Sequence, residues 1–319
     1  MISLTINGRA VEVPEGTTIL EAARVLGIDI PTLCYLKELE IVSSCRICVV
    51  DVRGWKNPTT ACSTLVSEGM EVETESERVV EYRKELLRLY LDNHPNDCLT
   101  CQKSGECELQ DLSYRYGVEF RDHDGERRKF KQAMFSDTSS PYILRDESKC
   151  ILCGRCVRTC AKVNRNVLSF ANRGFETRIA ADADETLEES TCVSCNRCVA
   201  ACPVGALMDR RAQHKVRNWK KDSELVECKR CEYGCQFELI REKGEDEVLA
   251  VKAVGAVSDK TPLCLRGRLT TELEYVDKPS SPYIKVETED GRKFKKASWL
   301  EAIEMEGVFD KLKEMEEKR

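Results

Sequence analysis

The chain has 319 residues, of which 19 are cysteines and 6% are aromatic, and its mean hydropathy is -0.43. So few large apolar side chains argue against one large apolar core. They favour an α+β string of small modules, each held together by something other than apolar burial. The formal net charge of -6 is spread along the chain, which argues against a nucleic-acid partner.

The cysteines are expected to bind metal rather than to form disulfides. The N-terminal stretch MISLTINGRAVEVPEG alternates apolar and polar residues and lacks the apolar centre of a signal peptide. No stretch approaches the roughly 18 apolar residues of a membrane helix. We therefore predict a cytoplasmic protein without a membrane segment. In that reducing compartment, clustered C-x2-C spacings favour metal binding.

Residues 1–76 are predicted to form a β-grasp ferredoxin domain. Two short strands flank Asn7-Gly8, a strong hairpin turn, and a helix follows from Thr17 or Thr18 to Gly27. A close C-x2-C pair with two distant partners suits a 2Fe–2S centre, with a zinc site as the alternative. The predicted ligands are Cys34, Cys45, Cys48 and Cys62.

Residues 77–120 are predicted to form a helical domain with a histidine-ligated 4Fe–4S cluster. Apolar residues at helical spacing indicate a helix over 77–92, with Thr74 and Glu77 as a capping box and Pro95 beyond its end. Only three cysteines follow, so His94 is needed to complete a set of four, as imidazole does in Rieske centres. A cysteine–histidine zinc knuckle is the alternative. The predicted ligands are His94, Cys98, Cys101 and Cys107.

Residues 121–220 are predicted to form a two-cluster 4Fe–4S ferredoxin domain. The run C-x2-C-x2-C-x3-C occurs twice, and the second copy is followed by proline. In this motif the fourth cysteine of each run ligates the other cluster. One predicted set is Cys150, Cys153, Cys156 and Cys202, and the other is Cys192, Cys195, Cys198 and Cys160.

Residues 221–290 contain a fifth cysteine group, and residues 291–319 are predicted to form a helical tail. Apolar residues at helical spacing from 298 onwards indicate an amphipathic helix there. The spacing C-x2-C-x3-C-x28-C suits a 4Fe–4S cluster, with a zinc ribbon as the alternative. The predicted ligands are Cys228, Cys231, Cys235 and Cys264.

The ligand count indicates an electron relay rather than a catalytic site. Nineteen cysteines and His94 make five sets of four, which predicts one 2Fe–2S and four 4Fe–4S clusters. No cysteine is left over as a nucleophile, and fully ligated clusters leave no open position for a substrate. Because no G-x-G-x-x-G or P-loop motif is present, flavin or nicotinamide chemistry must come from another chain. We therefore predict no catalytic residue.

Several motifs in residues 1–220 resemble one known family of iron–sulfur regions. They include SSCRICVVDV, NHPNDCLTCQKSGECELQDLSYRYG, CILCGRCVRTC, FANRGFET and CVSCNRCVAACPVGAL. The region is shared by the large peripheral subunit of respiratory complex I, the α subunit of NAD-linked formate dehydrogenases and the catalytic subunit of multimeric iron-only hydrogenases. The resemblance implies that His94 ligates a 4Fe–4S cluster. Ser43 departs from the glycine that the family often has before the CRIC pair.

Residues 228–300 resemble a different module, the N-terminal cluster module of molybdopterin enzymes. The segments CLRGR and KKASWLEAI carry this resemblance. It implies a 4Fe–4S cluster rather than zinc, and it gives Arg266 a cofactor-binding role between the cluster and a pterin. The chain contains neither the long pterin-binding domain nor the adjacent cysteine pair of the iron–iron hydrogenase site, so it resembles the shared relay without its catalytic domains.

Together the resemblances imply an electron-transfer subunit of a soluble, NAD(P)-linked and electron-bifurcating hydrogenase. The expected partners are a flavin- and NAD(P)-binding subunit, a small thioredoxin-like 2Fe–2S subunit, ferredoxin and a separate catalytic subunit, with a nickel–iron hydrogenase favoured. The same relay role in a tungsten or molybdenum formate or aldehyde dehydrogenase, or in a complex I-type NADH dehydrogenase, is the alternative. A freely diffusing polyferredoxin is a further alternative.

Overall fold

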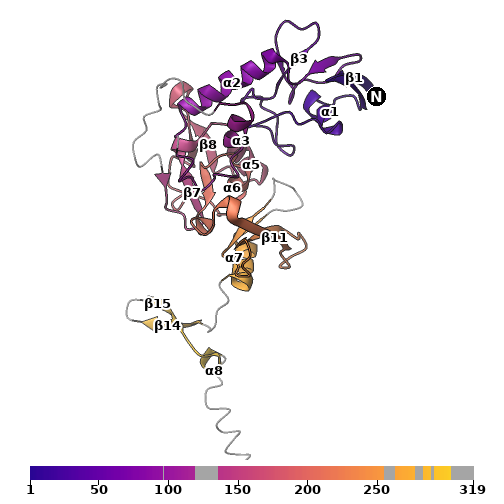
Figure 1. Ribbon diagram of the computed structural model, residues 1–319. Coiled ribbons are helices and arrows are strands. Elements are labelled where there is room, and N and C mark those ends of the chain that lie inside the picture. Colours follow the sequence, from indigo (N-terminus) through magenta and orange to yellow (C-terminus); the bar gives the residue numbers. More distant parts are fainter. Residues whose placement is uncertain (96, 119–135, 255–262, 277–282, 289–290, 303–319) are drawn as a thin grey trace, which may run out of the picture.

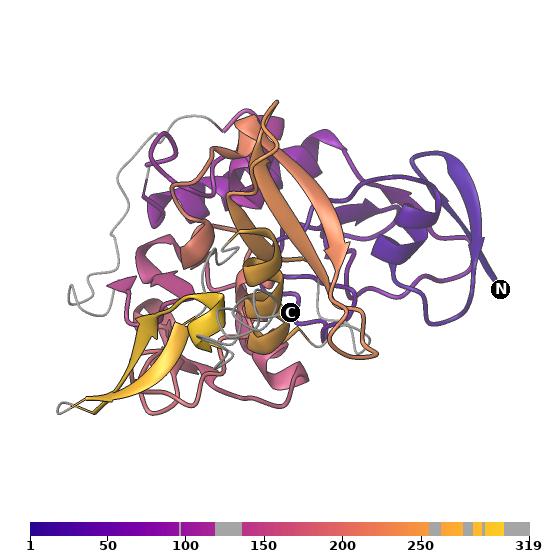
Figure 2. The ribbon, with the colours of Figure 1, turned by 90° about the horizontal axis from the view of Figure 1, so that it is seen from below.

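The computed structural model describes residues 1–95, 97–118, 136–254, 263–276, 283–288 and 291–302 (Figure 1). Among them, no helix is both long and apolar enough to cross a membrane. Figure 2 places the N-terminal domain at one end of the main body, with the N-terminus outermost.

The N-terminal domain is a five-stranded mixed sheet packed on one helix. The strand order is β2-β1-β5-β3-β4, in which β1 pairs antiparallel with β2 and parallel with β5. The predicted hairpin is confirmed, since Asn7 and Gly8 both have positive φ, 51° and 73°. The predicted helix is also confirmed, with the Thr18 side chain accepting from the Glu21 N–H. The elements are β1 (Ile2–Ile6), β2 (Arg9–Val13), α1 (Ile19–Val25), β3 (Val49–Val52), β4 (Thr59–Thr60) and β5 (Glu71–Glu73).

The predicted helix over 77–92 is confirmed, but its predicted capping box is wrong. Ser76 supplies the N-cap hydroxyl, which accepts from the Val79 N–H at 3.2 Å. Thr74 instead exchanges two hydrogen bonds of 2.8 Å with the Asn7 side chain, so it is held against the hairpin. The two helices of this region are α2 (Glu77–Asp92) and α3 (Glu108–Arg115).

Arg83 fixes α2 to the N-terminal domain. Its side chain is fully buried, and it donates to the backbone oxygens of Ile47 and Val49 at 3.0 and 2.7 Å. It also donates to the Glu75 carboxylate and the Tyr116 hydroxyl, both at 2.8 Å. Because the two carbonyls flank a cysteine of the first group, α2 and that cysteine loop are held as one unit.

Residues 136–220 form a unit in which each C-x2-C-x2-C-x3-C run leads into a helix. A three-stranded sheet of order β10-β7-β6 and a β8–β9 hairpin accompany the two helices, α5 and α6, which pack on each other. The elements are β6 (Ser136–Asp137), β7 (Ile143–Asp146), η1 (Glu147–Lys149), α5 (Arg155–Lys162), β8 (Leu168–Ala171), η2 (Gly174–Glu176), β9 (Arg178–Ala181), α6 (Arg197–Ala201), β10 (Leu207–Asp209), η3 (Arg210–Ala212) and η4 (Asn218–Lys220).

One buried core joins this unit to the helical region and to the first cysteine loop. Ile47 from the loop, Leu87 from α2, Leu109 from α3, and Val167 and Leu207 from the repeat unit all belong to it. The iron–sulfur modules are therefore packed closely together in this part of the molecule, because cysteines of the first four groups share one apolar interior.

The fifth cysteine group belongs to a smaller unit with a core of its own. An antiparallel sheet of order β11-β12-β13 packs on α7, and Phe237, Leu239, Val251 and Leu263 are buried between them. Figure 1 shows this sheet and α7 below the repeat unit. The elements are β11 (Lys221–Glu227), β12 (Gln236–Glu242), β13 (Ala250–Ala253) and α7 (Leu265–Tyr275).

The predicted helical tail over 291–319 is wrong at its start. Residues 291–296 form β15 (Gly291–Lys296), which pairs antiparallel with β14 (Tyr283–Thr288). The predicted boundary at residue 290 therefore lies between two paired strands. The helix α8 (Trp299–Ala302) begins near the predicted position, and the rest of the predicted tail helix lies outside the described residues.

Candidate iron–sulfur centres

The four cysteines of the first group lie together in the interior. Cys34, Cys45, Cys48 and Cys62 are each at most 3% exposed. A hydrogen bond from the Cys45 thiol lowers the pKa of Cys34 to about 5. A hydrogen bond from the Cys48 thiol likewise lowers the pKa of Cys62 to about 7. Hydrogen bonding therefore favours the thiolate form, which is the form that binds iron, at Cys34 and Cys62, whereas the same hydrogen bonds raise the pKa of Cys45 and Cys48.

Ser43 lies in the loop that presents these cysteines. Its φ is 50°, in the left-handed region, which accounts for the glycine that resembling proteins often have here. Its hydroxyl lies 3.5 Å from the Cys62 sulfur. Serine therefore keeps the loop conformation and adds a polar contact to a candidate ligand.

The eight cysteines of the repeat unit line two cavities. The cavities have empty volumes of about 420 and 470 Å³, so they are of similar size. Each contains three cysteines of one run and the fourth cysteine of the other run, as the sequence predicts. The first cavity is lined by Cys150, Cys153, Cys156 and Cys202, and the second by Cys192, Cys195, Cys198 and Cys160.

The two runs repeat the same backbone conformation around their cavities. Leu152 and Gly154 in the first run have φ of 55° and 67°, and Ser194 and Asn196 in the second have φ of 50° and 61°. Each turn directs an N–H group at a sulfur: those of Leu152 and Ser194 lie 3.4 Å from the sulfur two residues earlier. Hydrogen bonds to the sulfur atoms stabilise the negative charge of a bound cluster.

In the second cysteine group, the three cysteines lie close to one another, and His94, the predicted fourth ligand, lines a cavity. Burial raises the pKa of Cys107 to about 11, and the nearby Cys101 thiol adds to this shift. Burial also raises the pKa of Cys98, again with a contribution from Cys101, so the three thiols are neighbours. A Cβ at Gly205 would lie 3.1 Å from the Cys101 sulfur, so a glycine leaves space there. His94 lines a cavity with Tyr90, Cys150 and Phe175, and its ligand role stays a prediction.

The fifth cysteine group is brought together by β11, β12 and α7. The Cys228 N–H donates to the Cys235 carbonyl at 2.8 Å, which closes the loop between the strands. Cys264 forms the N-cap of α7, and a Cβ at Gly267 would lie 3.2 Å from the Cys228 sulfur and 3.6 Å from that of Cys264. Burial raises the pKa of Cys235, with smaller contributions from the other three thiols, led by Cys231.

Arg266 and Arg268 differ in their surroundings. Arg266, the residue that the sequence singles out, is exposed at the start of α7. Arg268 is only 2% exposed and pairs with Asp209 of β10 at 2.6 Å and with Glu272 at 3.1 Å. Arg268 thus joins the fifth group to the repeat unit. The sequence contained one signal for it, a helical Arg–Glu pair at i,i+4.

Arg158 connects the first cysteine group to the repeat unit. Its guanidinium donates to the carbonyls of Cys34 and Glu40, both at 2.6 Å, and to that of Cys153 at 3.1 Å. One positive charge therefore lies between candidate ligands of two different clusters. No spacing in the sequence points to this role, because the partners are backbone carbonyls, and those of Cys34 and Glu40 are more than a hundred residues away.

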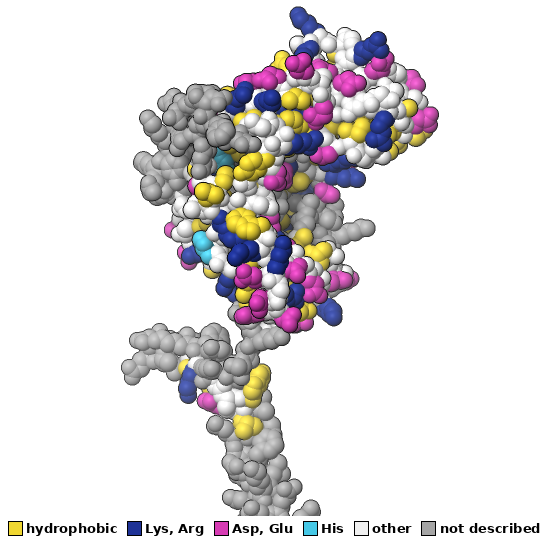
Figure 3. Space-filling model, in the orientation of Figure 1, with side chains coloured by type: hydrophobic (Ala, Val, Ile, Leu, Met, Phe, Trp, Pro, Cys, Tyr) yellow, Lys and Arg dark blue, Asp and Glu magenta, His cyan; other side chains and the backbone are white. Residues whose placement is uncertain are grey.

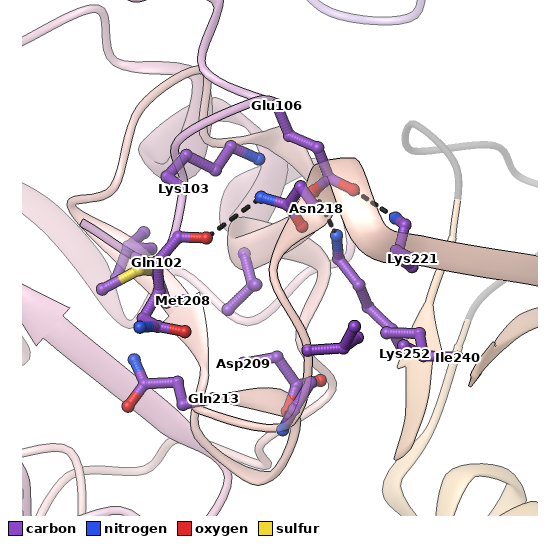
Figure 4. A pocket seen from close by; sticks show the side chains of 14 residues that line it. Gln102, Lys103, Glu106, Met208, Asp209, Gln213, Asn218, Lys221, Ile240 and Lys252 are labelled. Carbon is purple, nitrogen blue, oxygen red and sulfur yellow. Dashed lines mark hydrogen bonds and ion pairs between the residues drawn. The ribbon is translucent and has the colours of Figure 1, made fainter. Parts of the chain in front are cut away.

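A polar cavity lies at the junction of the second group, the repeat unit and the β11–β13 sheet (Figure 4). Glu106 pairs there with Lys221 of β11 and, at 2.9 Å, with Lys252 of β13. Burial alone would raise the pKa of Glu106, but the two ammonium groups outweigh it and hold the pKa at about 2. The junction is thus an ion-pair contact between parts of the chain.

Within the described part of the chain, no three His, Cys, Asp or Glu side chains converge as the ligands of a single metal ion do. The thiolates of a 4Fe–4S cluster each bind a different iron atom, and those of a 2Fe–2S cluster bind its two iron atoms in pairs, so they surround a volume rather than a point. The donor sets fit clusters in this respect, because eight cysteines line two cavities and glycines leave room beside the sulfur atoms of two further groups.

Three family models match successive parts of the chain. The 2Fe-2S iron-sulfur cluster binding domain matches residues 1–77. The NADH-ubiquinone oxidoreductase-G iron-sulfur binding region matches residues 83–122, and the 4Fe-4S dicluster domain matches residues 149–206. The matched order is the order of the first four predicted clusters.

Individual relatives extend the likeness. The NADP-reducing hydrogenase subunit HndD of Solidesulfovibrio fructosivorans is 45% identical over 216 residues, which is 66% of this chain and 36% of HndD. The NADPH-Fe(3+) oxidoreductase subunit alpha of Geobacter sulfurreducens is 36% identical over 296 residues, 91% of this chain and 34% of the relative. The chain thus spans little more than a third of the length of these curated relatives.

A solved structure matches over most of its own length. The crystal structure of an NAD+-reducing [NiFe]-hydrogenase in the H2-reduced state contains a chain with 31% identity and a TM-score of 0.62. The match covers 67% of this chain and 90% of that chain. The protein therefore belongs to the family of iron–sulfur electron-transfer subunits found in NAD(P)-linked hydrogenases and NADH-quinone oxidoreductases.

Proposed function

We propose that the chain holds one 2Fe–2S and four 4Fe–4S clusters and relays electrons within a cytoplasmic, NAD(P)-linked oxidoreductase complex. The two cavities of the repeat unit, each lined by four cysteines from both runs, carry the proposal. When bound, such clusters accept and release single electrons. The cysteines hold the clusters, the surrounding apolar core keeps water away from them, and Arg158 holds two of the ligand loops together.

The proposed modules follow the ligand sets. A β-grasp 2Fe–2S domain comes first, then a domain in which His94 is the fourth ligand, then the two-cluster ferredoxin unit. The fifth module is of the molybdopterin-enzyme type, with Arg266 facing a cofactor or partner beyond the cluster. Arg266 is exposed in the structure, which suits such a contact.

The proposed partners are a flavin- and NAD(P)-binding subunit, a small 2Fe–2S subunit, ferredoxin and a separate catalytic subunit. A nickel–iron hydrogenase is the favoured catalytic subunit, with electron bifurcation as the mode of coupling. The likeness to a chain of an NAD+-reducing [NiFe]-hydrogenase supports this choice. A second candidate is an NADH-quinone oxidoreductase, because a component of such an enzyme from Rhizobium meliloti aligns over 95% of this chain.

Anaerobic isolation of the native complex tests the proposal. Iron analysis should give about 18 iron atoms per chain, from one 2Fe–2S and four 4Fe–4S clusters. Mass spectrometry of the co-purifying chains should identify flavin and hydrogenase subunits, with nickel in the metal analysis. Tungsten or molybdenum without nickel would indicate that the chain serves a pterin dehydrogenase instead of a hydrogenase. A preparation from anaerobic cells that contains no iron would refute the electron-relay function itself.

A His94→Cys variant tests the second ligand set separately. Thiolate in place of neutral imidazole makes the cluster more negative, so its reduction potential should fall while the iron content stays the same. Redox titration followed by electron paramagnetic resonance measures the potential. An unchanged titration would show that His94 is not a ligand.

A further inference from the structure

A run of positive charge follows the repeat unit. Residues 210–221 contain six Lys or Arg and no Asp or Glu, although the whole chain has a net charge of -6. In Figure 3, Lys and Arg side chains surround an exposed hydrophobic side chain on the lower half of the main body, and Asp and Glu side chains lie below them. The six cations are Arg210, Arg211, Lys215, Arg217, Lys220 and Lys221.

An exposed tryptophan lies among these charges. Trp219 is 54% exposed, and the Arg217 guanidinium stacks 4.7 Å from the centre of its ring. Lys215 and Lys220 are exposed on either side in sequence, and the Lys243 ammonium donates to the Trp219 carbonyl at 3.0 Å. We call these five residues the Trp219 surface. Tryptophan and arginine are the side chains that most often anchor protein interfaces.

The Trp219 surface is attached to the loop that presents the second cysteine group. Arg217 donates to the Cys101 carbonyl at 3.2 Å and also to the Leu99 carbonyl. Asn218 donates to the carbonyls of Gln102 and Ser104 at 3.0 and 2.9 Å, and Figure 4 shows the first of these contacts. Segments more than a hundred residues apart are therefore fixed to each other.

The same loop reaches the protein surface. Leu99 is 90% exposed, and its neighbour Cys98 is exposed as well, in contrast to the buried Cys107. A candidate cluster ligand, an exposed apolar side chain and a group of cations are thus adjacent on one face. Electron transfer needs a short distance between redox centres, and this face offers one to a partner outside the chain.

We propose that the Trp219 surface docks a small electron-carrier protein with an acidic face. This inference deepens the proposed function, because it rests on a cluster held in part by Cys98. Opposite charges steer such encounters and set their orientation, and weak redox encounters bury little area. The exchange is one electron, lost by the carrier and gained by this chain, with no proton or other reactant.

Binding can be measured without electron transfer. The probe is an acidic two-cluster ferredoxin whose iron is replaced by redox-inert gallium, titrated calorimetrically into the anaerobic holoprotein. Affinity should fall steeply between about 0.01 M and 1 M salt, over which charge screening shortens from about 30 to 3 Å. The double variant Lys215→Glu with Lys220→Glu should weaken binding at low salt by about tenfold or more.

A matched control reverses the same amount of charge elsewhere. Arg9→Glu with Lys56→Glu changes two exposed residues of the N-terminal domain and should leave the affinity within about twofold. Equal losses in both double variants would overturn the proposal, since only net charge would then matter. Tighter binding of a short DNA duplex than of the ferredoxin would overturn it too.

Cluster spectra separate this inference from the proposed function. Iron content and the paramagnetic signals after dithionite reduction should be the same in the wild type and in both double variants. Intact signals without any ferredoxin binding would refute the docking surface alone. Absence of the cluster signals from the wild-type protein would refute the relay on which the docking surface rests.

Discussion

The repeat unit, with two sets of four cysteines, and the fifth cysteine group, with one set of four, place their cysteines in different surroundings. In the repeat unit, Cys156 and Cys202 are each 8% exposed and belong to a core shared with two other cysteine groups. In the fifth group, Cys231 and Cys264 are exposed, and the module has a small core of its own. The first arrangement depends on shared apolar packing, and the second on local loops.

The attachments of the two regions differ in the same way. Apolar side chains, together with charged side chains such as Arg158, join the repeat unit to its neighbours, whereas the fifth module has its own core and is joined by charged pairs, Arg268 with Asp209 and Glu106 with Lys221 and Lys252. Buried pairs are costly to break because the remaining partner keeps an uncompensated charge. Removal of the fifth module would therefore leave buried Asp209 without its cation, whereas removal of the repeat unit would open the shared apolar core.

The largest expected effect tests the shared packing of the repeat unit. Cys202→Ala should remove the cluster held by the first run, although Cys202 follows the second run in sequence. The mirror variant Cys160→Ala should remove the other cluster. Alkylation of the freed thiols followed by mass spectrometry identifies the exposed set. Alkylation of the run that contains the mutated cysteine, instead of the other run, would contradict the crossed pairing. The alkylated positions to be detected are Cys150, Cys153 and Cys156 in the first run and Cys192, Cys195 and Cys198 in the second.

The next effect tests the charged attachment of the fifth module. Arg268→Ala leaves Asp209 buried without its cation and should destabilise the junction by about 3–5 kcal/mol. Anaerobic urea denaturation and limited proteolysis of the β11–β13 region measure the change. Lys220→Ala is the control, because its pair with Glu242 is exposed and should cost about 0.5 kcal/mol or less. Equal costs would remove the contrast between the two regions.

A smaller effect concerns the charge between two clusters. Arg158→Gln removes a cation that contacts the carbonyls of Cys34 and Cys153, so both clusters should become harder to reduce. A loss of about 1 kcal/mol in charge stabilisation corresponds to roughly 40 mV for one electron. Redox titration measures both potentials. Arg53→Gln, at an exposed pair with Glu71, is the control and should leave them unchanged.

The smallest effect concerns the loop of the first group. Ser43→Gly relieves a left-handed serine and should stabilise the loop by about 0.5 kcal/mol after loss of the hydroxyl contact to Cys62. Ser43→Ala keeps the strain and removes only the hydroxyl, so it should be less stable than both. Thermal unfolding of the anaerobic holoprotein ranks the three. If the glycine variant is less stable than the alanine variant, the positive φ at residue 43 does not destabilise the loop.

The sequence predicts the local elements, and which cysteines of the repeat unit lie together, better than the packing of the modules on one another. The turn at Asn7-Gly8, the helix after Thr18 and the helix over 77–92 follow from short-range preferences and appear as expected. The crossed cysteine sets follow from the C-x2-C-x2-C-x3-C spacing, which is typical of two-cluster ferredoxins. The shared core was missed, because low aromatic content says little about which small apolar residues meet.

The contacts of Arg83 and Arg158 could not have been predicted from the sequence. Arg83 and Arg158 act on backbone carbonyls, which every residue has, so nothing in the sequence marks their partners. Ser76 displaced Thr74 as helix cap because Thr74 was taken by Asn7, a contact that depends on the folded sheet. The pairing of β14 with β15 was also missed, and the boundary expected at residue 290 falls between these two strands.

Asn196 gives the repeat unit a built-in attachment point. Its counterpart in the first run, Gly154, has a phenylalanine ring where a Cβ would stand, at 3.0 Å. Asn196 has the same left-handed backbone, and its amide donates to Asp209 at 3.1 Å, the carboxylate that Arg268 neutralises. A shortened version of this protein for engineering, cut before β11, would leave the Asp209 carboxylate without the guanidinium of Arg268. In such a version, Asp209→Asn would remove the unpaired charge, so the repeat unit could fold without the fifth module and without additional apolar packing.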